Sequence, residues 1–173
     1  MADKCHHNIN PCGGGCAHCG CNCGGNDPAD PVPDAIPAFG SLRGITIEVP
    51  GAALESIPFH LAGPLSDTVR VSQSGNELVA GESGVYQISL SVSAEATAEP
   101  DADQPYLNAL ITVNGKPVFG DISTYFKISN RSSSTFVVQA VLSAGDEVGA
   151  GISSYFLALG YMNRSLSIVK LSN

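Results

Sequence analysis

The stretch that decides the fold is GVYQISLSVSAE at residues 84–95, where apolar and small polar side chains alternate. The alternation runs through Val85, Ile88, Leu90 and Val92, although its register is imperfect. Alternation with a period of two is typical of a β-strand that buries one face. The turn cluster Gly81-Glu-Ser-Gly84 marks its start. We therefore predict a long strand within an antiparallel β structure.

Similar strand-like runs lie on both sides of this stretch. Asn114-Gly115 favours a type I′ hairpin, and Ser143-Ala-Gly145-Asp146 is another turn cluster. The continuous run Phe136-Val137-Val138 suggests a strand covered on both faces. No stretch combines a 3.6-residue apolar period with capping residues. The chain therefore predicts an all-β sandwich, with strands at 45–49, 57–61, 68–72, 77–80, 84–95, 106–113, 117–128, 134–142, 147–156 and 164–171.

Composition is compatible with one folded domain and an appendage. Of 173 residues, 43% are hydrophobic and only 14% are charged, which is enough apolar material for a core. The net charge is −8, and the eight basic residues are scattered singly, so the basic footprint of a nucleic-acid-binding protein is missing. No apolar run is long enough for a membrane helix, and the N-terminus lacks the apolar stretch of a secretory signal. We expect neither a nucleic-acid nor a membrane partner.

The chain changes composition twice. Residues 1–25 hold all six cysteines, three of the four histidines and six glycines, so they cannot bury a core of their own. Residues 26–37, NDPADPVPDAIP, predict an extended Pro-rich spacer, although a plain flexible linker fits equally. The strand-like pattern occupies 38–173. We predict a Cys/His/Gly-rich tail, a linker and a β domain.

The tail cysteines permit three interpretations. They could form disulfides, mostly between subunits, because Cys21 and Cys23 are too close for an easy mutual bridge. They could bind zinc or copper(I), with imidazoles from His6, His7 or His18 as substitute ligands. The tail could also be reduced and disordered. The even count in a core-poor segment favours cross-linking; the residues concerned are Cys5, Cys12, Cys16, Cys19, Cys21 and Cys23.

Nothing in the sequence predicts a catalytic centre. A glycine-rich tail supplies neither the positioned base nor the walled pocket that a nucleophilic cysteine needs. His60, in a strand-like run, is interpreted as a half-buried strand residue. The acidic stretch EATAEPDADQP lacks a calcium-loop pattern and is interpreted as a solvated loop; its acids are Glu95, Glu99, Asp101 and Asp103. Asn130-Arg-Ser132 and Asn163-Arg-Ser165 match a glycosylation acceptor, which would mean nothing in a bacterial cytoplasm.

Several fragments resemble the jelly rolls of complement globular heads and tumour necrosis factors. These are Gly84-Val-Tyr86-Gln-Ile88, the element Leu142-Ser-Ala-Gly145-Asp146-Glu-Val148, and the closing strand at 165–171. Ala38-Phe-Gly-Ser-Leu42 and Ile57-Pro-Phe59 are similar to the opening of the C-terminal domain of bacterial exosporium collagen-like glycoproteins. The resemblance covers residues 38–173 and implies a ten-stranded jelly roll that assembles as a homotrimer.

The chain departs from the exosporium pattern because a Pro-rich spacer and a cysteine tail replace the collagen stalk. Spore appendage subunits, which are jelly rolls with cysteine-bearing N-terminal extensions, resemble this arrangement. The resemblance implies a non-enzymatic assembly protein of a spore surface or extracellular appendage, linked through its tail to other copies or to another fibre protein. Synthesis in a mother cell followed by lysis would explain cysteines without a signal peptide. The alternatives are a ligand-binding trimeric head and soft-metal binding by the tail.

Overall fold

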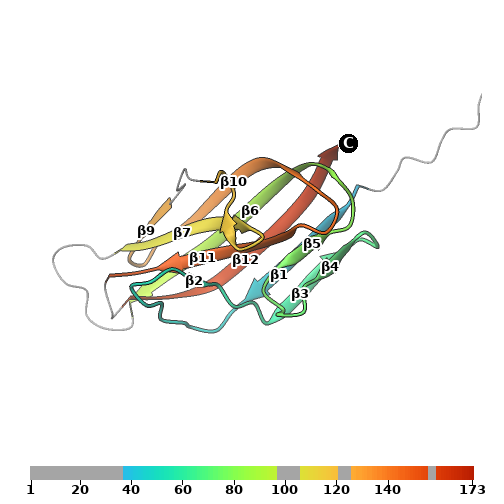
Figure 1. The fold of residues 1–173 in the computed structure, drawn as a ribbon. Helices are drawn as coiled ribbons and strands as arrows, with labels where there is room; N and C mark the ends of the chain where they lie inside the picture. The colour runs from blue at the N-terminus through green and yellow to red at the C-terminus, as the bar shows by residue number, and fades with distance from the viewer. Residues whose placement is uncertain (1–36, 97–105, 121–125, 156–158) are drawn as a thin grey trace, which may run out of the picture. The chain divides into compact units, whose positions relative to one another are not determined.

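The computed structural model describes residues 37–96, 106–120, 126–155 and 159–173, which lie within the compact unit Ile36–Asn173. These residues form twelve β-strands, two of which, β2 and β8, have only two residues each. The strands make two antiparallel sheets that pack against each other (Figure 1). This confirms the predicted all-β jelly roll. Among the described residues, no helix has the length and hydropathy needed to cross a membrane.

The first sheet, sheet A, has five strands. Their order is β10 (Ser133–Leu142), β6 (Gly84–Ala96), β12 (Leu159–Ser172), β1 (Phe39–Gly44) and β3 (Leu61–Leu65). The second, sheet B, has the order β4 (Val69–Val71), β5 (Leu78–Ala80), β11 (Glu147–Ser153), β7 (Tyr106–Val113) and β8 (Lys116–Pro117). In addition, β2 (Glu55–Ser56) pairs with β11, and β9 (Phe126–Ser129) pairs with β7.

The alternation in β6 sets the core. Tyr86, Ile88, Leu90 and Val92 are fully buried between the sheets, whereas Val85 lies on the other side of the strand and is half-buried. Burying each such side chain stabilises the fold by roughly 1.5–3 kcal/mol. Sheet B contributes the facing layer, which includes Leu107, Ala109, Ile111, Val148, Ala150 and Ile152.

The predicted closing strand is confirmed as β12, and its apolar side chains differ in burial. Leu166 and Ile168 are fully buried, but Leu171 is 49% exposed. Leu171 follows Ile168 by three residues, so alternation places it on the opposite face of the strand from Leu166 and Ile168.

The first two predicted strands are wrong. The strand at 45–49 is replaced by β1 at Phe39–Gly44, and the segment that follows makes a single isolated bridge, Glu48 to Tyr161. Residues 57–60 lie outside any strand, and β3 begins at Leu61. Ile57 and Phe59 are nevertheless buried. These two apolar side chains therefore attach a segment that crosses between the sheets to the core, and they do not belong to a paired strand.

Two further predictions need correction. The predicted strand 117–128 is interrupted, because β8 ends at Pro117 and residues 118–120 form a turn before β9 begins at Phe126. The run Phe136-Val137-Val138 was expected to be covered on both faces. Within this chain only Val138 is buried, and Val137 is 52% exposed. One face of β10 is therefore open.

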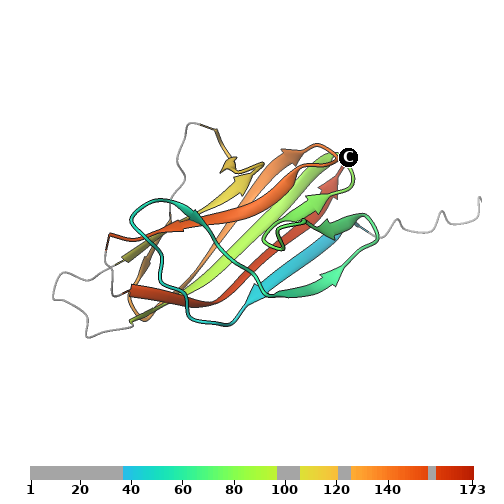
Figure 2. The same cartoon turned by 60° about the horizontal axis from the view of Figure 1, so that its bottom comes forward.

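The chain enters and leaves the sandwich at one end. Phe39 pairs with Val169, and Lys170 donates its backbone N–H to the carbonyl of Ala38 over 2.8 Å. Figures 1 and 2 show the start of β1, in blue, beside the end of β12, which carries the C label. In Figure 2 the teal segment after β1 crosses from sheet A to β11 of sheet B. The domain boundaries themselves stay a prediction.

Candidate functional site

The outer face of sheet A is almost uncharged. Strand pairing aligns its side chains in rows across the sheet, because cross-strand partners share a face. One row is Val137, Ser89, Ser167 and Ser41. Outward positions on β1, β6, β10 and β12 include Phe39, Ser41, Arg43, Val85, Gln87, Ser89, Ser91, Ser93, Glu95, Ser133, Thr135, Val137, Gln139, Val141, Ser165, Ser167 and Val169. Only two of these seventeen positions carry a charge.

This outer face combines exposed valines with hydroxyl groups that pair with one another. Val141 is 80% exposed and Val137 is 52% exposed on β10. The hydroxyls of Ser93 and Ser133 lie 2.8 Å apart, and Thr135 Oγ1 donates to Ser91 Oγ over 3.1 Å. Hydroxyls that already have partners lose less when a surface is buried. The outer face of sheet A is therefore suited to contact with another protein surface.

The signature residues quoted from the sequence take structural positions at the end of the sandwich where the chain enters and leaves. Tyr86 is buried and its hydroxyl donates to the carbonyl of Glu82 over 2.9 Å. Burial raises the pKa of Tyr86, and the charge of Glu82 adds to the rise while Lys170 opposes it. Gly84 passes so close to the carbonyl of Ser172 that a Cβ would collide with it. Ile88 and Val148 are fully buried core residues.

Asp146 joins two turns. Its Oδ1 accepts a hydrogen bond from Asn114 Nδ2 over 2.8 Å, and its Oδ2 accepts one from the backbone of Ser143 over 2.7 Å. Asn114 returns the contact, because its Oδ1 accepts from the backbone of Glu147 over 2.9 Å. Gly145 precedes with φ 96°, a left-handed conformation that favours glycine. The pattern Gly-Asp-x-Val thus holds the β7–β8 and β10–β11 turns together.

The most unusual side chain, Arg164, was missed by sequence reasoning. It is 1% exposed and lies next to Asn163, which has φ 46°, at a register shift between β12 and β6. Its Nε donates to Pro58 O over 2.7 Å and its Nη1 to Thr46 O over 2.5 Å. The only sequence signal was Asn163, a residue type that tolerates the left-handed conformation. From inside the sandwich, Arg164 therefore binds the 45–60 segment near both of its ends, at Thr46 and at Pro58.

The ring of Tyr161 lies beneath this arginine. Arg164 Cζ is 5.3 Å from the ring centroid, within cation–π range. Burial raises the pKa of Tyr161 to about 12, while the nearby Arg164 opposes the rise and Glu48 adds to it. The phenol therefore stays neutral across the physiological range. It covers the guanidinium without pairing with its charge.

His60 is not the half-buried strand residue that was expected. It lies in the loop before β3, and its side chain is 43% exposed. Thr46 Oγ1, Arg164 Nη2 and Glu48 Oε1 lie 2.7, 3.0 and 3.5 Å from the same atom, Nε2. A catalytic triad needs the nucleophile on one ring nitrogen and the acid on the other. The three contacts of His60 described above all involve Nε2, so they do not have that arrangement.

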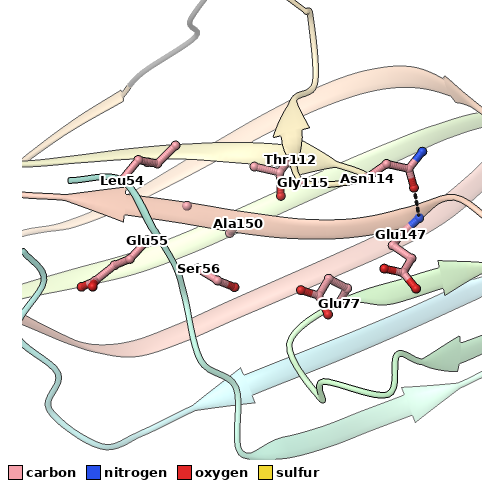
Figure 3. Close-up of a pocket in the computed structure, with 10 residues that line it drawn as sticks. Leu54, Glu55, Ser56, Glu77, Thr112, Asn114, Gly115, Glu147 and Ala150 are labelled. Atoms are coloured by element: carbon pink, nitrogen blue, oxygen red, sulfur yellow. Dashed lines mark hydrogen bonds between the residues drawn. The ribbon is translucent and has the colours of Figure 1, made fainter.

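A shallow groove of about 390 Å³ lies on the opposite side of the sandwich, over β11 (Figure 3). Ala150 and Gly151 form a floor of small residues, and the lining includes three carboxylates, Glu55, Glu77 and Glu147. Glu77 accepts from the hydroxyls of Ser72 and Ser74, and Glu55 accepts from the backbone of Gly51. Neither lysine nor arginine lines the groove among the described residues. Its chemistry would suit a cationic group.

The predicted tail site cannot be located. The cysteines and His6, His7 and His18 lie outside the described residues, as do Glu99, Asp101 and Asp103. Within the described ranges, no group of three His, Cys, Asp or Glu side chains could hold a metal ion. Of the two acceptor motifs, Asn163 is exposed and Asn130 is half-buried with its Oδ1 enclosed.

Comparisons with known proteins add little to this geometry. No family model matches the chain, and no curated protein matches it either. A solved structure described as "Structure of Eiger TNF from S. frugiperda" is similar, with 12% sequence identity and a TM-score of 0.49. The match covers 79% of this chain and 94% of that one. The fold assignment therefore rests on the sheet order, the strand pairing and the core described above.

Proposed function

We propose that this protein is a non-enzymatic structural module whose jelly-roll heads assemble as a homotrimer through the outer face of sheet A. The supporting observation is the combination of exposed valines, internally paired hydroxyls and near absence of charge on that face. A chain with net charge −8 repels its own copies, so an uncharged face is where copies can meet. The resemblance to trimeric jelly rolls is the reason for proposing that three copies assemble.

The N-terminal cysteines supply the covalent part of the proposed assembly. The head has no cysteine of its own, because all six lie at or before position 23. Disulfides between tails would link trimers to one another or to another fibre protein, and the oxidising setting would be a spore surface or an extracellular appendage. Soft-metal binding by the same thiolates is the alternative.

Charged substitutions on the outer face of sheet A test whether this face holds the trimer together. Replacing Val137 and Val141 together by Glu places two carboxylates on each copy of the outer face of sheet A, and the native mass should fall from trimer to monomer. The matched control is Arg70→Glu, which adds negative charge to an exposed position of β4 in sheet B. A trimeric V137E/V141E protein would contradict the assignment of the face, as would dissociation by the control alone.

The tail is tested by removing sulfur. Replacing all six cysteines by Ser should leave folded trimeric heads but abolish covalent species on non-reducing gels. Oxidised wild-type protein should show bands larger than 17.8 kDa that collapse with reductant. Equally resistant assemblies from the cysteine-free protein would rule out the tail as a cross-linker. Stoichiometric zinc or copper in anaerobically purified protein would favour the metal alternative.

A second candidate function is ligand binding, which the groove over β11 favours. Its small-residue floor and its carboxylates suit a cationic side chain or amine. Probing glycan and protein arrays with the full-length protein under reducing conditions would test this. Binding that is lost in Glu147→Gln would place the ligand in the groove, whereas no binding would leave the assembly role alone.

A further inference from the structure

Polar contacts, rather than a packed apolar face, hold the segment Ile45–Leu54 against the sandwich. Its apolar side chains Ile45, Ile47 and Val49 are 62%, 53% and 52% exposed. Pro50 is the one buried residue of the segment. Because burial stabilises a side chain in proportion to the area removed from water, these exposed chains contribute little. The attachment must come from hydrogen bonds.

Several of the side-chain hydrogen bonds among them involve Arg164, whereas Ser154 donates its backbone N–H to the carbonyl of Gly51 over 2.9 Å. Glu48 exchanges two backbone bonds with Tyr161 over 2.9 and 2.8 Å, and Thr46 O accepts from Arg164 Nη1. Arg164 Nη2 lies 3.0 Å from His60 Nε2 and 3.3 Å from Thr46 Oγ1. A guanidinium can only donate, so His60 Nε2 must accept. In the state in which Arg164 donates to it, Nε2 is unprotonated, and the Thr46 hydroxyl, which lies 2.7 Å from Nε2 and 2.9 Å from Glu48 Oε1, donates to one of these two acceptors.

Few charges face His60. Glu48 Oε1 lies 3.5 Å from both His60 Nε2 and Arg164 Nη2. Tyr161, on the far side of the guanidinium, is neutral because burial raises its pKa to about 12. From β1, Arg43 contributes its backbone carbonyl, which accepts from the His60 backbone over 2.9 Å. A proton on Nε2 would give two cations 3.0 Å apart, with a single carboxylate to offset them.

We propose that His60 is a proton-sensitive catch for the segment Ile45–Leu54. In the neutral state Nε2 accepts from Arg164 and holds the guanidinium in the position from which it binds Thr46. When the imidazole takes up a proton, Nε2 becomes a donor and the Arg164 contact becomes repulsive. Arg164 then withdraws, Thr46 loses its partner, and the segment opens. Imidazole is the side chain suited to this change between pH 5 and 8.

Hydrogen exchange of full-length protein tests the catch on single residues. The amides of Glu48 and Tyr161 should be protected at pH 7.5 and should lose at least about tenfold in protection at pH 5.5, after correction for intrinsic rates. Amides in the centre of β6 serve as the internal reference and should not change. Equal protection of Glu48 and Tyr161 at both pH values would overturn the proposal.

Two variants identify the titrating group. His60→Gln keeps a neutral acceptor at every pH, so its segment should stay closed at pH 5.5. The matched control replaces His6, His7 and His18 by Gln and should open as wild type does. Opening of the His60→Gln protein at pH 5.5, or loss of the response in the tail variant alone, would overturn the proposal.

If His60→Gln does not fold, a measurement on the wild-type protein still tests whether His60 is the group that responds to pH. The midpoint of the exchange change should coincide with the titration of the His60 ring followed by NMR, and a midpoint that follows any other group would contradict the catch. The readout lies within one chain. It is therefore independent of whether copies assemble through sheet A.

Discussion

Gly44 lies directly against the guanidinium of Arg164, so that a Cβ on Gly44 would fall 2.5 Å from both Cζ and Nε. The two residues are also strand partners, one at the end of β1 and the other in β12. The arginine can enter the sandwich because its partner has no side chain. This relationship positions the group that holds the whole 45–60 segment.

The first prediction concerns this contact. Gly44→Ala should destabilise the protein by about 1–3 kcal/mol in chemical denaturation, because the added methyl would displace the buried guanidinium from the carbonyls that it binds. Gly51→Ala is the control, since its nearest atom would be 4.0 Å away, and should change stability by less than about 0.5 kcal/mol. Equal effects of both substitutions would contradict the packing described here.

Arg164 itself should not tolerate Lys. An ammonium lacks the planar fork that reaches Pro58 O and Thr46 O together, so at least one of these carbonyls loses its donor and the buried site loses part of its pairing. Arg164→Lys should therefore cost at least about 2 kcal/mol in the free energy of unfolding. Arg70→Lys, at an exposed position of β4, should be neutral. An Arg164→Lys protein as stable as wild type would refute the anchoring role.

The strand at 84–95 was predictable from the sequence because burial follows its alternation from Ile88 onward, although Val85 lies on the opposite face. Ile88, Leu90 and Val92 all lie in the core, and the turns at Asn114-Gly115 and Gly145-Asp146 connect strands as expected. The error at 45–49 has a physical cause. Ile45, Ile47 and Val49 alternate with polar residues as in a strand, but their side chains are exposed to solvent rather than buried in the core. Sequence alone does not show which face of an extended segment meets the core.

Other features depend on register, which the sequence did not reveal. β1 contains two glycines and an arginine, which weaken its strand pattern. A buried arginine contradicts the general expectation for charged residues, so Arg164 could not be recognised. The outer face of sheet A becomes visible only when four strands are aligned, because its residues come from β1, β6, β10 and β12.

Tyr161 predicts an alkaline dependence of stability. Its pKa is raised from 10.0 to about 12 in the folded protein, so the folded state retains a proton that the unfolded state loses. Stability should fall as pH rises from about 10 to about 12, by up to about 1.4 kcal/mol per pH unit from this group. Tyr161→Phe should flatten this part of the profile, whereas Tyr155→Phe, at a 73% exposed position, should leave it unchanged. Unfolding curves measured between pH 9 and 12 would decide.

Asp146 predicts a local loss of stability. Asp146→Ala removes the acceptor for Asn114 Nδ2 and for the Ser143 backbone, and should cost about 1–2 kcal/mol in denaturant unfolding. Asp67→Ala, in the exposed turn between β3 and β4, is the control and should change stability by less than about 0.5 kcal/mol. If Asp146→Ala and Asp67→Ala both have the same free energy of unfolding as wild type, the hydrogen bonds of Asp146 between the two turns contribute nothing to stability.

The trimer is tested most directly by the native mass of the wild-type protein in excess reductant, measured by light scattering. Reduction removes any contribution of tail disulfides, so a trimer that remains is held together without them. We predict three times the chain mass of 17.8 kDa. A mass of a single chain at micromolar concentration would contradict the proposal.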